Sequence, residues 1–213
     1  VNLTTTNIQS QPRVTQLANG NILVVWTSDD STGVGSPIGT DIIGQIFDPL
    51  GTPIGGEFLV NVGATQHQEA APDIAALPDG GFINVEERPS NFYHDILIQV
   101  HSATGTVTFN GTAFFDPGPD DAYAPRVAVS SGTSVLVIWR TDQPGDSAIT
   151  GRIFNPATNT FGGEFALIDT AEPDTDPSVT VLTNGNYAIA AARTIAGNNE
   201  ITVTVISSAG AVV

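Results

Sequence analysis

The stretch Pro12-Arg13-Val14-Thr15-Gln16-Leu17-Ala18-Asn19-Gly20-Asn21-Ile22-Leu23-Val24-Val25-Trp26 decides the fold of this chain. Its alternating segment from Val14 to Leu17 predicts a short strand, and Ile22 to Trp26 predicts a second, apolar strand. The dipeptide Asn19-Gly20 between them is a strong signal for a tight hairpin turn. The stretch therefore predicts an antiparallel hairpin introduced by a proline.

The same hairpin recurs along the whole chain. Its opening prolines are Pro12, Pro72, Pro125 and Pro177, which lie 60, 53 and 52 residues apart. Second strands are predicted to begin at Ile22, Phe82, Val135 and Tyr187, and further strands near Asp41, Ile96, Ile149 and Ile201. A fixed period of this length is typical of repeat architectures, so we interpret the chain as four copies of one unit.

Each unit is predicted to hold four strands. In the first copy the third strand runs from Asp41 to Phe47, and a fourth runs from Glu57 to Val62. The sequence Gly55-Gly56-Glu57-Phe58 returns as Gly162-Gly163-Glu164-Phe165, which places a fourth strand in a later copy as well. Six additional residues of the first copy fall most economically in the loop from Ser28 to Thr40, which marks that loop as surface.

Four antiparallel strands repeated four times predict an all-β, four-bladed β-propeller. We expect one domain over residues 1–213, with repeats at about 12–61, 72–116, 125–169 and 177–213 plus 1–6. Trp26 and Trp139 occupy one repeat position, with Glu86 and Ala191 as counterparts, and the two tryptophans are predicted to fill the core between blades.

The ends of the chain determine how the ring closes. The last copy stops before its fourth strand, and the segment from Val1 to Thr6 aligns with a fourth strand. We expect this N-terminal segment to complete the last blade. The same alignment fits a piece of a longer tandem array, a processed product, or a strand supplied to a neighbouring molecule.

Composition limits the partners. The formal net charge is −16 from 22 acidic and six basic residues, all six of them arginine. This charge repels nucleic acid and anionic membranes, and leaves cations, basic proteins and neutral glycans as partners. The chain has no cysteine and no long apolar run, so neither a disulfide framework nor membrane insertion is expected.

Most carboxylates are predicted to lie on one loop face of the propeller, among them Glu69 and Asp95. A hard cation relieves repulsion in such a cluster, and calcium is the natural candidate cofactor. The candidate ligands are Asp116, Asp120 and Asp121, then Asp169, Asp174 and Asp176, and finally Asp29, Asp30 and Asp41. The alternative is an acidic, solvated rim without a defined site, because no EF-hand loop or calcium-binding nonapeptide is present.

A second group of candidate ligand-binding residues lies near the ends of the second strands: Glu86, Glu87, Arg88, Arg140 and Arg193. The arginines could clamp a carboxylate, although pairing with the acidic rim is the simpler role. Glu86 and Glu87 are neighbours on a strand, so they point to opposite faces and cannot by themselves flank one glycosidic bond. The carbonyl groups before the four prolines could hold water or an ion at the axis, or the prolines could only stiffen the strands.

Catalytic motifs are not found in the sequence. The three histidines lack metal-site spacing, Ser36 is not in a nucleophile elbow, and no Asp box of the sialidase kind is present. The sequence alone therefore favours a protein that is not an enzyme.

The first unit carries a resemblance to a known class. Its residues 12–14, 17–26, 41–48 and 55–61 resemble repeats in large secreted bacterial calcium-binding proteins of the haemolysin-type (RTX) class and related adhesins. The resemblance spans all four copies and weakens where Glu86-Glu87 replaces the tryptophan position. It implies an extracellular or cell-surface bacterial module without catalysis of its own.

Together these observations predict a non-catalytic extracellular recognition or adhesion module whose acidic loop face contacts a glycan or a cell-surface protein. The alternative is a structural subunit of a surface layer or filament that self-associates by exchange of the terminal strand. A glycosidase-like enzyme is the third and disfavoured interpretation.

Overall fold

The structure is a computed structural model, and it describes residues 7–29, 39–63, 68–89, 94–114, 121–143, 146–169, 174–195 and 198–213. These residues form fifteen β-strands and no helix. The strands group into four separate antiparallel sheets, which we call blades 1 to 4 in chain order. The predicted all-β class is therefore confirmed, and the strands form four successive antiparallel sheets.

Blades 1 and 2 each contain four strands in sequential order. Blade 1 consists of β1 (Gln9–Gln16), β2 (Ile22–Ser28), β3 (Asp41–Phe47) and β4 (Pro53–Leu59). Blade 2 consists of β5 (Ala70–Ala76), β6 (Phe82–Pro89), β7 (His94–His101) and β8 (Val107–Phe114). The predicted starts of the second strands at Ile22 and Phe82 are confirmed, and the long loop of the first copy does connect its second and third strands.

Blade 3 also has four strands, whereas blade 4 has three among the residues described. Blade 3 consists of β9 (Asp121–Ser131), β10 (Ser134–Gln143), β11 (Asp146–Asn155) and β12 (Thr160–Ile168). Blade 4 consists of β13 (Asp174–Val181), β14 (Tyr187–Ile195) and β15 (Asn198–Ile206). After a turn, Val212 forms an isolated bridge with Ile206, at the position of a fourth strand.

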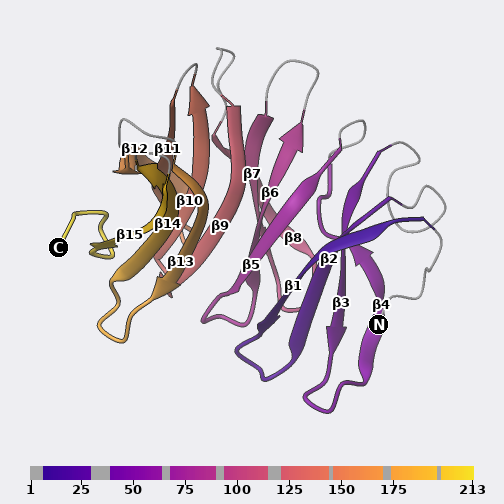
Figure 1. The fold of residues 1–213 in the computed structure, drawn as a ribbon. Coiled ribbons are helices and arrows are strands. Elements are labelled where there is room, and N and C mark those ends of the chain that lie inside the picture. The colour runs from indigo at the N-terminus through magenta and orange to yellow at the C-terminus, as the bar shows by residue number, and fades with distance from the viewer. Residues whose placement is uncertain are drawn as a thin grey trace.

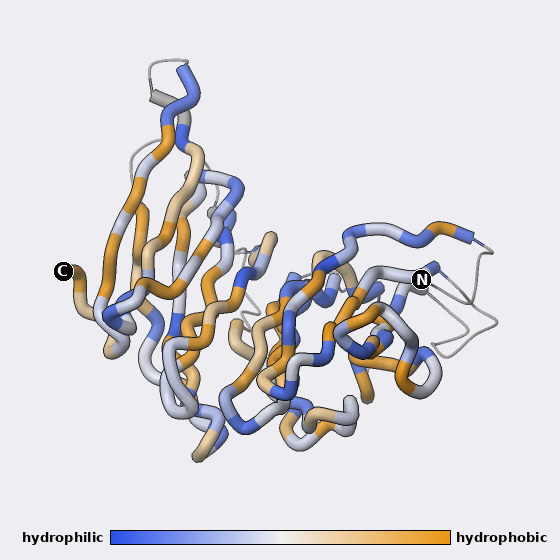
Figure 2. Tube along the Cα trace, turned by 90° about the horizontal axis from the view of Figure 1, so that it is seen from below, coloured by the Kyte–Doolittle hydropathy of each residue, from blue (hydrophilic) through white to orange (hydrophobic). Residues whose placement is uncertain are grey.

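The blades fan out around their first strands, as in a propeller (Figure 1). Strand β1 contacts β5, β5 contacts β9, and β9 contacts β13, so the first strands form the inner edge of the array. Figure 2 shows the N-terminal and C-terminal blades at two separate ends of an open arc. The prediction of a closed ring is therefore wrong for the described residues, because no strand in them joins blade 4 to blade 1. The proposed closing strand, residues 1–6, lies outside the described residues.

Three apolar clusters lie between consecutive blades, at what we call joints 1–2, 2–3 and 3–4. Joint 2–3 is the largest and contains Val135, Val137 and Trp139 from β10, packed against β6 and β7. Trp139 is fully buried and Trp26 is 5% exposed, so the prediction that both tryptophans are core residues is confirmed. Joint 1–2 is different, because its apolar cluster gives way to buried polar side chains.

Candidate functional site

The four inner strands share a backbone irregularity at their prolines. The residue before each proline adopts a left-handed conformation, with φ of 52° at Gln11, 49° at Ala71, 49° at Ala124 and 51° at Asp176. Strand pairing shifts register at all four places. Proline cannot donate a hydrogen bond, and a bulge re-aims the neighbouring side chains, so each inner strand turns polar groups toward the centre of the array.

Six polar side chains gather around these bulges and form what we call the axial site. Three of them, Arg13, Asp73 and Arg126, directly follow the prolines of β1, β5 and β9. The complete set is Gln11, Arg13, Asp73, Glu87, Arg126 and Asp176. Gln11 and Asp176 are exposed, and the other four residues are partly buried.

Side chains of the axial site connect blade 1 to blade 2 and blade 2 to blade 3. The Gln11 side-chain oxygen accepts a hydrogen bond from the Ala71 backbone N–H at 2.9 Å. Glu87 Oε1 accepts one from the Ala124 backbone N–H at 2.6 Å. Two of the backbone donors exposed by the bulges are satisfied in this way, and Glu87 is held in a fixed orientation.

Asp73 is the most constrained carboxyl group of the site. Its Oδ2 accepts a hydrogen bond from the Val127 N–H at 3.0 Å, and its Oδ1 lies 3.5 Å from Arg13 Nε. The side chain is only 17% exposed. Burial raises the pKa of Asp73 above the ordinary aspartate value, and this effect outweighs the Val127 N–H and the positive charges of Arg126 and Arg13. Asp73 therefore retains its proton to a higher pH than an exposed aspartate.

Arg126 lies among the carboxylates of the axial site. Its guanidinium donates to the Pro125 carbonyl at 2.7 Å, and Arg13 makes the equivalent bond to Pro12 at 3.0 Å. Burial lowers the pKa of Arg126, while the nearby carboxylates of Asp73, Glu87 and Asp176 oppose that shift. The arrangement combines a carboxyl group with a raised pKa, two further acidic side chains and two guanidinium groups.

The predicted metal ligands do not form a cluster among the residues that the structure describes. Asp30, Asp116 and Asp120 lie outside the described residues, and Asp29 and Asp169 are exposed. Asp121 accepts hydrogen bonds from the His94 N–H and the Tyr123 hydroxyl, whereas Asp176 belongs to the axial site. Within the described ranges no three acidic or histidine side chains are placed to hold a metal ion. Calcium binding stays a prediction.

The expectation of a solvated acidic rim is wrong for five of its members. The side chains of Asp41, Glu69, Glu86, Asp95 and Asp174 are at most 3% exposed. Asp41, Asp95 and Asp174 lie at or next to the starts of β3, β7 and β13, Glu69 directly precedes β5, and Glu86 lies within β6. Packing of the sheets removes all five from solvent. Assigning these carboxylates to loops by their position in the sequence could not show that they are buried.

The second group of predicted ligand residues is divided between different environments. Glu86 is buried on the face of β6 that points to blade 1, whereas Glu87 faces Ala124 of blade 3, as their opposite orientations predicted. Arg88 pairs with Asp95 at 2.6 Å and Arg140 with Asp142 at 2.8 Å, which confirms the simpler role of these two arginines. Arg193 lies opposite Asp174 in the β13–β14 pairing. Ligand binding by this group stays a prediction.

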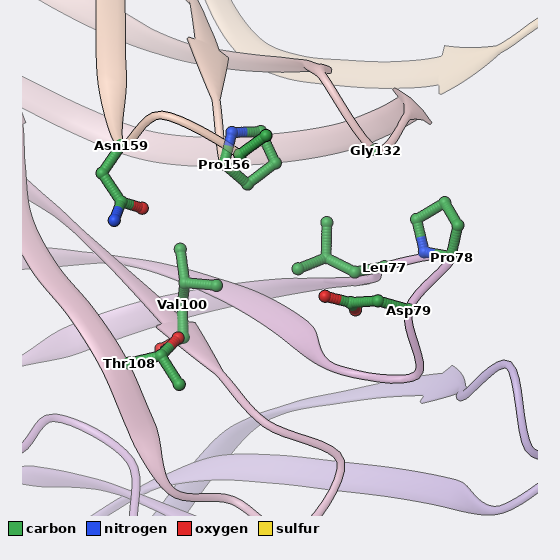
Figure 3. A pocket seen from close by; sticks show the side chains of 9 residues that line it. Leu77, Pro78, Asp79, Val100, Thr108, Gly132, Pro156 and Asn159 are labelled. Atoms are coloured by element: carbon green, nitrogen blue, oxygen red, sulfur yellow. The ribbon is translucent and has the colours of Figure 1, made fainter.

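A pocket of about 530 Å³ lies between blades 2 and 3, near the hairpin turns (Figure 3). Its lining residues are Leu77, Pro78, Asp79, Val100, Thr108, Gly132, Pro156, Ala157 and Asn159. Asp79 is the one acidic residue among them, and its Oδ1 already accepts the Gly81 N–H. The pocket therefore lacks the paired carboxyl groups that the axial site provides.

Three solved structures that share this fold carry the names of carbohydrate-cleaving enzymes. An α-L-arabinofuranosidase from Fusarium graminearum matches 92% of this chain with a TM-score of 0.59 and 14% identity, and the match covers 61% of that enzyme. An endo-arabinase from Bacteroides thetaiotaomicron matches 92% of the chain with a TM-score of 0.54 and 14% identity, covering 74% of its length. An exo-β-1,3-galactanase from Phanerochaete chrysosporium matches 99% with a TM-score of 0.56 and 13% identity, covering 50% of its length.

This chain therefore spans 50–74% of the length of those enzymes. At such low identity the matches establish the fold. No family model and no curated protein matches the sequence.

These structures overturn the functional interpretation of the sequence. The predicted kinship with haemolysin-type repeats and adhesins is contradicted, because the solved structures reported above that share the fold are those of an arabinofuranosidase, an endo-arabinase and a galactanase. The predictions of a non-catalytic recognition module and of a structural filament subunit are contradicted by the same matches. The periodic prolines and turns encode a blade, and a blade can be used by proteins of unrelated function.

Proposed function

We propose that this chain acts on a glycan as a glycoside hydrolase, with the axial site as its catalytic centre. The observation that carries this proposal is the pair of Asp73 and Glu87 beside the Arg126 guanidinium: burial raises the pKa of the Asp73 carboxyl group, and a backbone N–H fixes the Glu87 carboxyl group. Glycoside hydrolysis requires two carboxyl groups with different protonation states. The likeness of fold to arabinan- and galactan-cleaving enzymes supports this class of reaction.

Asp73 serves as the general acid in the proposed reaction. It transfers its proton to the glycosidic oxygen as the bond from that oxygen to the anomeric carbon breaks. The carboxylate that remains is stabilised by the Val127 N–H and by Arg13, both already in place. Burial raises the pKa of Asp73 and so favours its protonated form, and these partners lower the energy of the carboxylate formed when the proton is transferred.

Glu87 serves as the base. It takes a proton from a water molecule whose oxygen bonds to the anomeric carbon, so that one water is consumed for each bond cleaved. The Ala124 N–H holds Glu87 Oε1 at 2.6 Å and leaves the second carboxylate oxygen for this role. Arg126 lies near both carboxyl groups and balances the charge that moves between them.

The proposal agrees with a glycan as partner and with action outside the cell. No helix among the described residues is long and apolar enough to cross a membrane. The absence of cysteine and methionine suits an oxidising environment. Binding to a cell-surface protein and self-association stay predictions.

Hydrolysis of arabinans and β-1,3-galactans, measured by release of reducing sugar, tests the proposal. We expect Asp73→Asn and Glu87→Gln each to reduce kcat/KM by at least about 100-fold. Asp79→Asn is the matched control, because Asp79 lies on an exposed turn far from the axial site and its amide replacement keeps the bond to Gly81. The value of kcat/KM should fall as the pH rises through the raised pKa of Asp73, because the general acid then loses its proton.

Two outcomes contradict this function. One is a wild-type protein that cleaves none of these glycans, and the other is hydrolysis that survives both substitutions at the level of the Asp79→Asn control.

A further inference from the structure

A pair of buried glutamates lies at joint 1–2, apart from the axial site. Glu69 precedes Pro72 by three residues and Glu86 follows it by fourteen, which are the positions of Gln9 and Trp26 relative to Pro12. In blade 1 these two side chains touch, since Trp26 Nε1 donates to Gln9 Oε1 at 2.8 Å. The repeat therefore places two carboxyl groups at positions that are in contact in the equivalent blade.

Each glutamate has one satisfied oxygen and one without a partner. Glu69 Oε2 accepts from the Asn61 amide at 3.1 Å, and Glu86 Oε2 accepts from the Asn84 amide at 2.6 Å. Oε1 of Glu69 and Oε1 of Glu86 have no hydrogen-bond partner among the described residues. Both side chains are 0% exposed. Two ionised carboxylates in this position would be costly, because neither free oxygen has a donor.

Negative charge predominates around the pair. Asp41 at the start of β3 is bridged to Glu69 by the Asn61 amide, and its charge acts on both glutamates. On β6, Arg88 is engaged with Asp95 of β7 at 2.6 Å. His101 of β7 stacks on Phe82, and burial lowers its pKa to about 4, so it is neutral at ordinary pH. The carboxyl groups near this joint therefore outnumber the positive charges: Arg88 is the one arginine beside Glu69, Glu86, Asp41 and Asp95. Binding of a proton is the simplest way to reduce the excess negative charge.

We propose that Glu69 and Glu86 share one proton, and that losing this proton weakens joint 1–2, which makes the joint a pH-sensitive connection between blades 1 and 2. With the proton in place, one carboxyl group donates to the free oxygen of the other. Without it, two buried carboxylates repel each other and Asp41 across the joint. This inference does not depend on the proposed activity.

The direction of the pH effect follows from the pKa values. Burial, together with the charge of neighbouring carboxylates, raises the pKa of Glu86 to about 8 and that of Glu69 to about 7. A glutamate in the unfolded chain titrates near 4.5. Folding therefore takes up protons between pH 4.5 and about 8, so stability is greatest at the acidic end of this window and falls as the pH rises through it.

Infrared spectroscopy of the wild-type chain tests the shared proton directly. We expect the absorption band of a protonated carboxyl group at pH 6.5, and its loss between pH 7 and pH 9. Glu86→Gln should remove the band, whereas Glu200→Gln, at an exposed position on β15, should leave it unchanged. Absence of the band from the wild type at pH 6.5 overturns the proposal.

The melting temperature measures the effect on the joint. Between pH 5.5 and pH 9 the wild type should lose at least about 4 °C more than Glu86→Gln does, while Glu200→Gln should follow the wild type. The rate of backbone amide hydrogen exchange, corrected for its intrinsic pH dependence, should increase with pH at joint 1–2 and not at joint 2–3. The proposal is overturned if the melting temperatures of wild type and Glu86→Gln change with pH by the same amount. It is also overturned if added divalent cation, rather than pH, determines the melting temperature of the wild type. If Glu86→Gln does not fold, Glu69→Gln takes its place.

Discussion

Joints 1–2 and 2–3 differ in the side chains that they carry at equivalent strand positions, which are partly polar at joint 1–2 and apolar at joint 2–3. The face of β10 at joint 2–3 carries Val135, Val137 and Trp139, whereas the same positions of β6 at joint 1–2 carry Phe82, Asn84 and Glu86. Both faces are buried, and both strands keep their pairing with neighbours on either side. The backbone of a blade is thus specified by its proline and turns, and the contacts between blades can be either apolar or polar.

The largest effect is expected at the apolar joint. Trp139→Ala should reduce the free energy of unfolding by about 3–5 kcal/mol, because a fully buried ring that packs against Phe114 is removed. Urea denaturation measures this loss, with Thr180→Ala on an exposed position as control. Trp139→Phe should lose much less. A loss below about 1 kcal/mol for Trp139→Ala would mean that joint 2–3 does not depend on this packing.

An intermediate effect is expected at the polar joint. Asn61→Ala should cost about 2–4 kcal/mol, since Asn61 donates to Asp41 and Glu69 and accepts the Ile42 N–H, all of them buried. Asn110→Ala is the matched control, because this exposed asparagine makes a single bond to the Val62 carbonyl and should cost under about 1 kcal/mol. Equal losses in the two variants would show that the polar network does not hold joint 1–2.

The smallest effect is expected where there is no joint. Val203 on β15 is 62% exposed and Ile201 is 72% exposed, on the face of blade 4 that no described sheet covers. Val203→Thr should change the unfolding free energy by less than about 0.5 kcal/mol, because the side chain is already in water. A destabilisation above about 1 kcal/mol, measured by the same denaturation, would indicate that this face is packed in solution.

The sequence predicted the backbone better than the chemistry. Periodic prolines, Asn-Gly and Asp-Gly turns, and alternating apolar residues located the second strands to within one residue, because these signals act locally. The enclosure of Glu69, Glu86 and Asp95 depends on which blade a strand face meets, and that contact is set by tertiary packing. Assigning residues to loops by sequence position could not reveal it.

The axial site was missed for a related reason. The signal is present in the sequence, because Arg13, Asp73 and Arg126 each follow a repeat proline, but position after a proline does not by itself show that side chains from three different strands meet. The resemblance to haemolysin-type repeats misled because it was carried by strand and turn residues. Such residues can be shared by blades of unrelated proteins, whereas function depends on the particular side chains of a site.

The hydrogen bonds between successive bulges also bear on how such a protein diversifies after gene duplication. Gln11 of one blade reaches the main chain of the second, but the second reaches the third through Glu87, a residue on a different strand. The four repeat units therefore cannot be exchanged freely. A blade moved to another position in the array would lack the side-chain oxygen that accepts the backbone N–H of the following blade. The order of the blades is thus constrained by these hydrogen bonds as well as by the shape of the sheets.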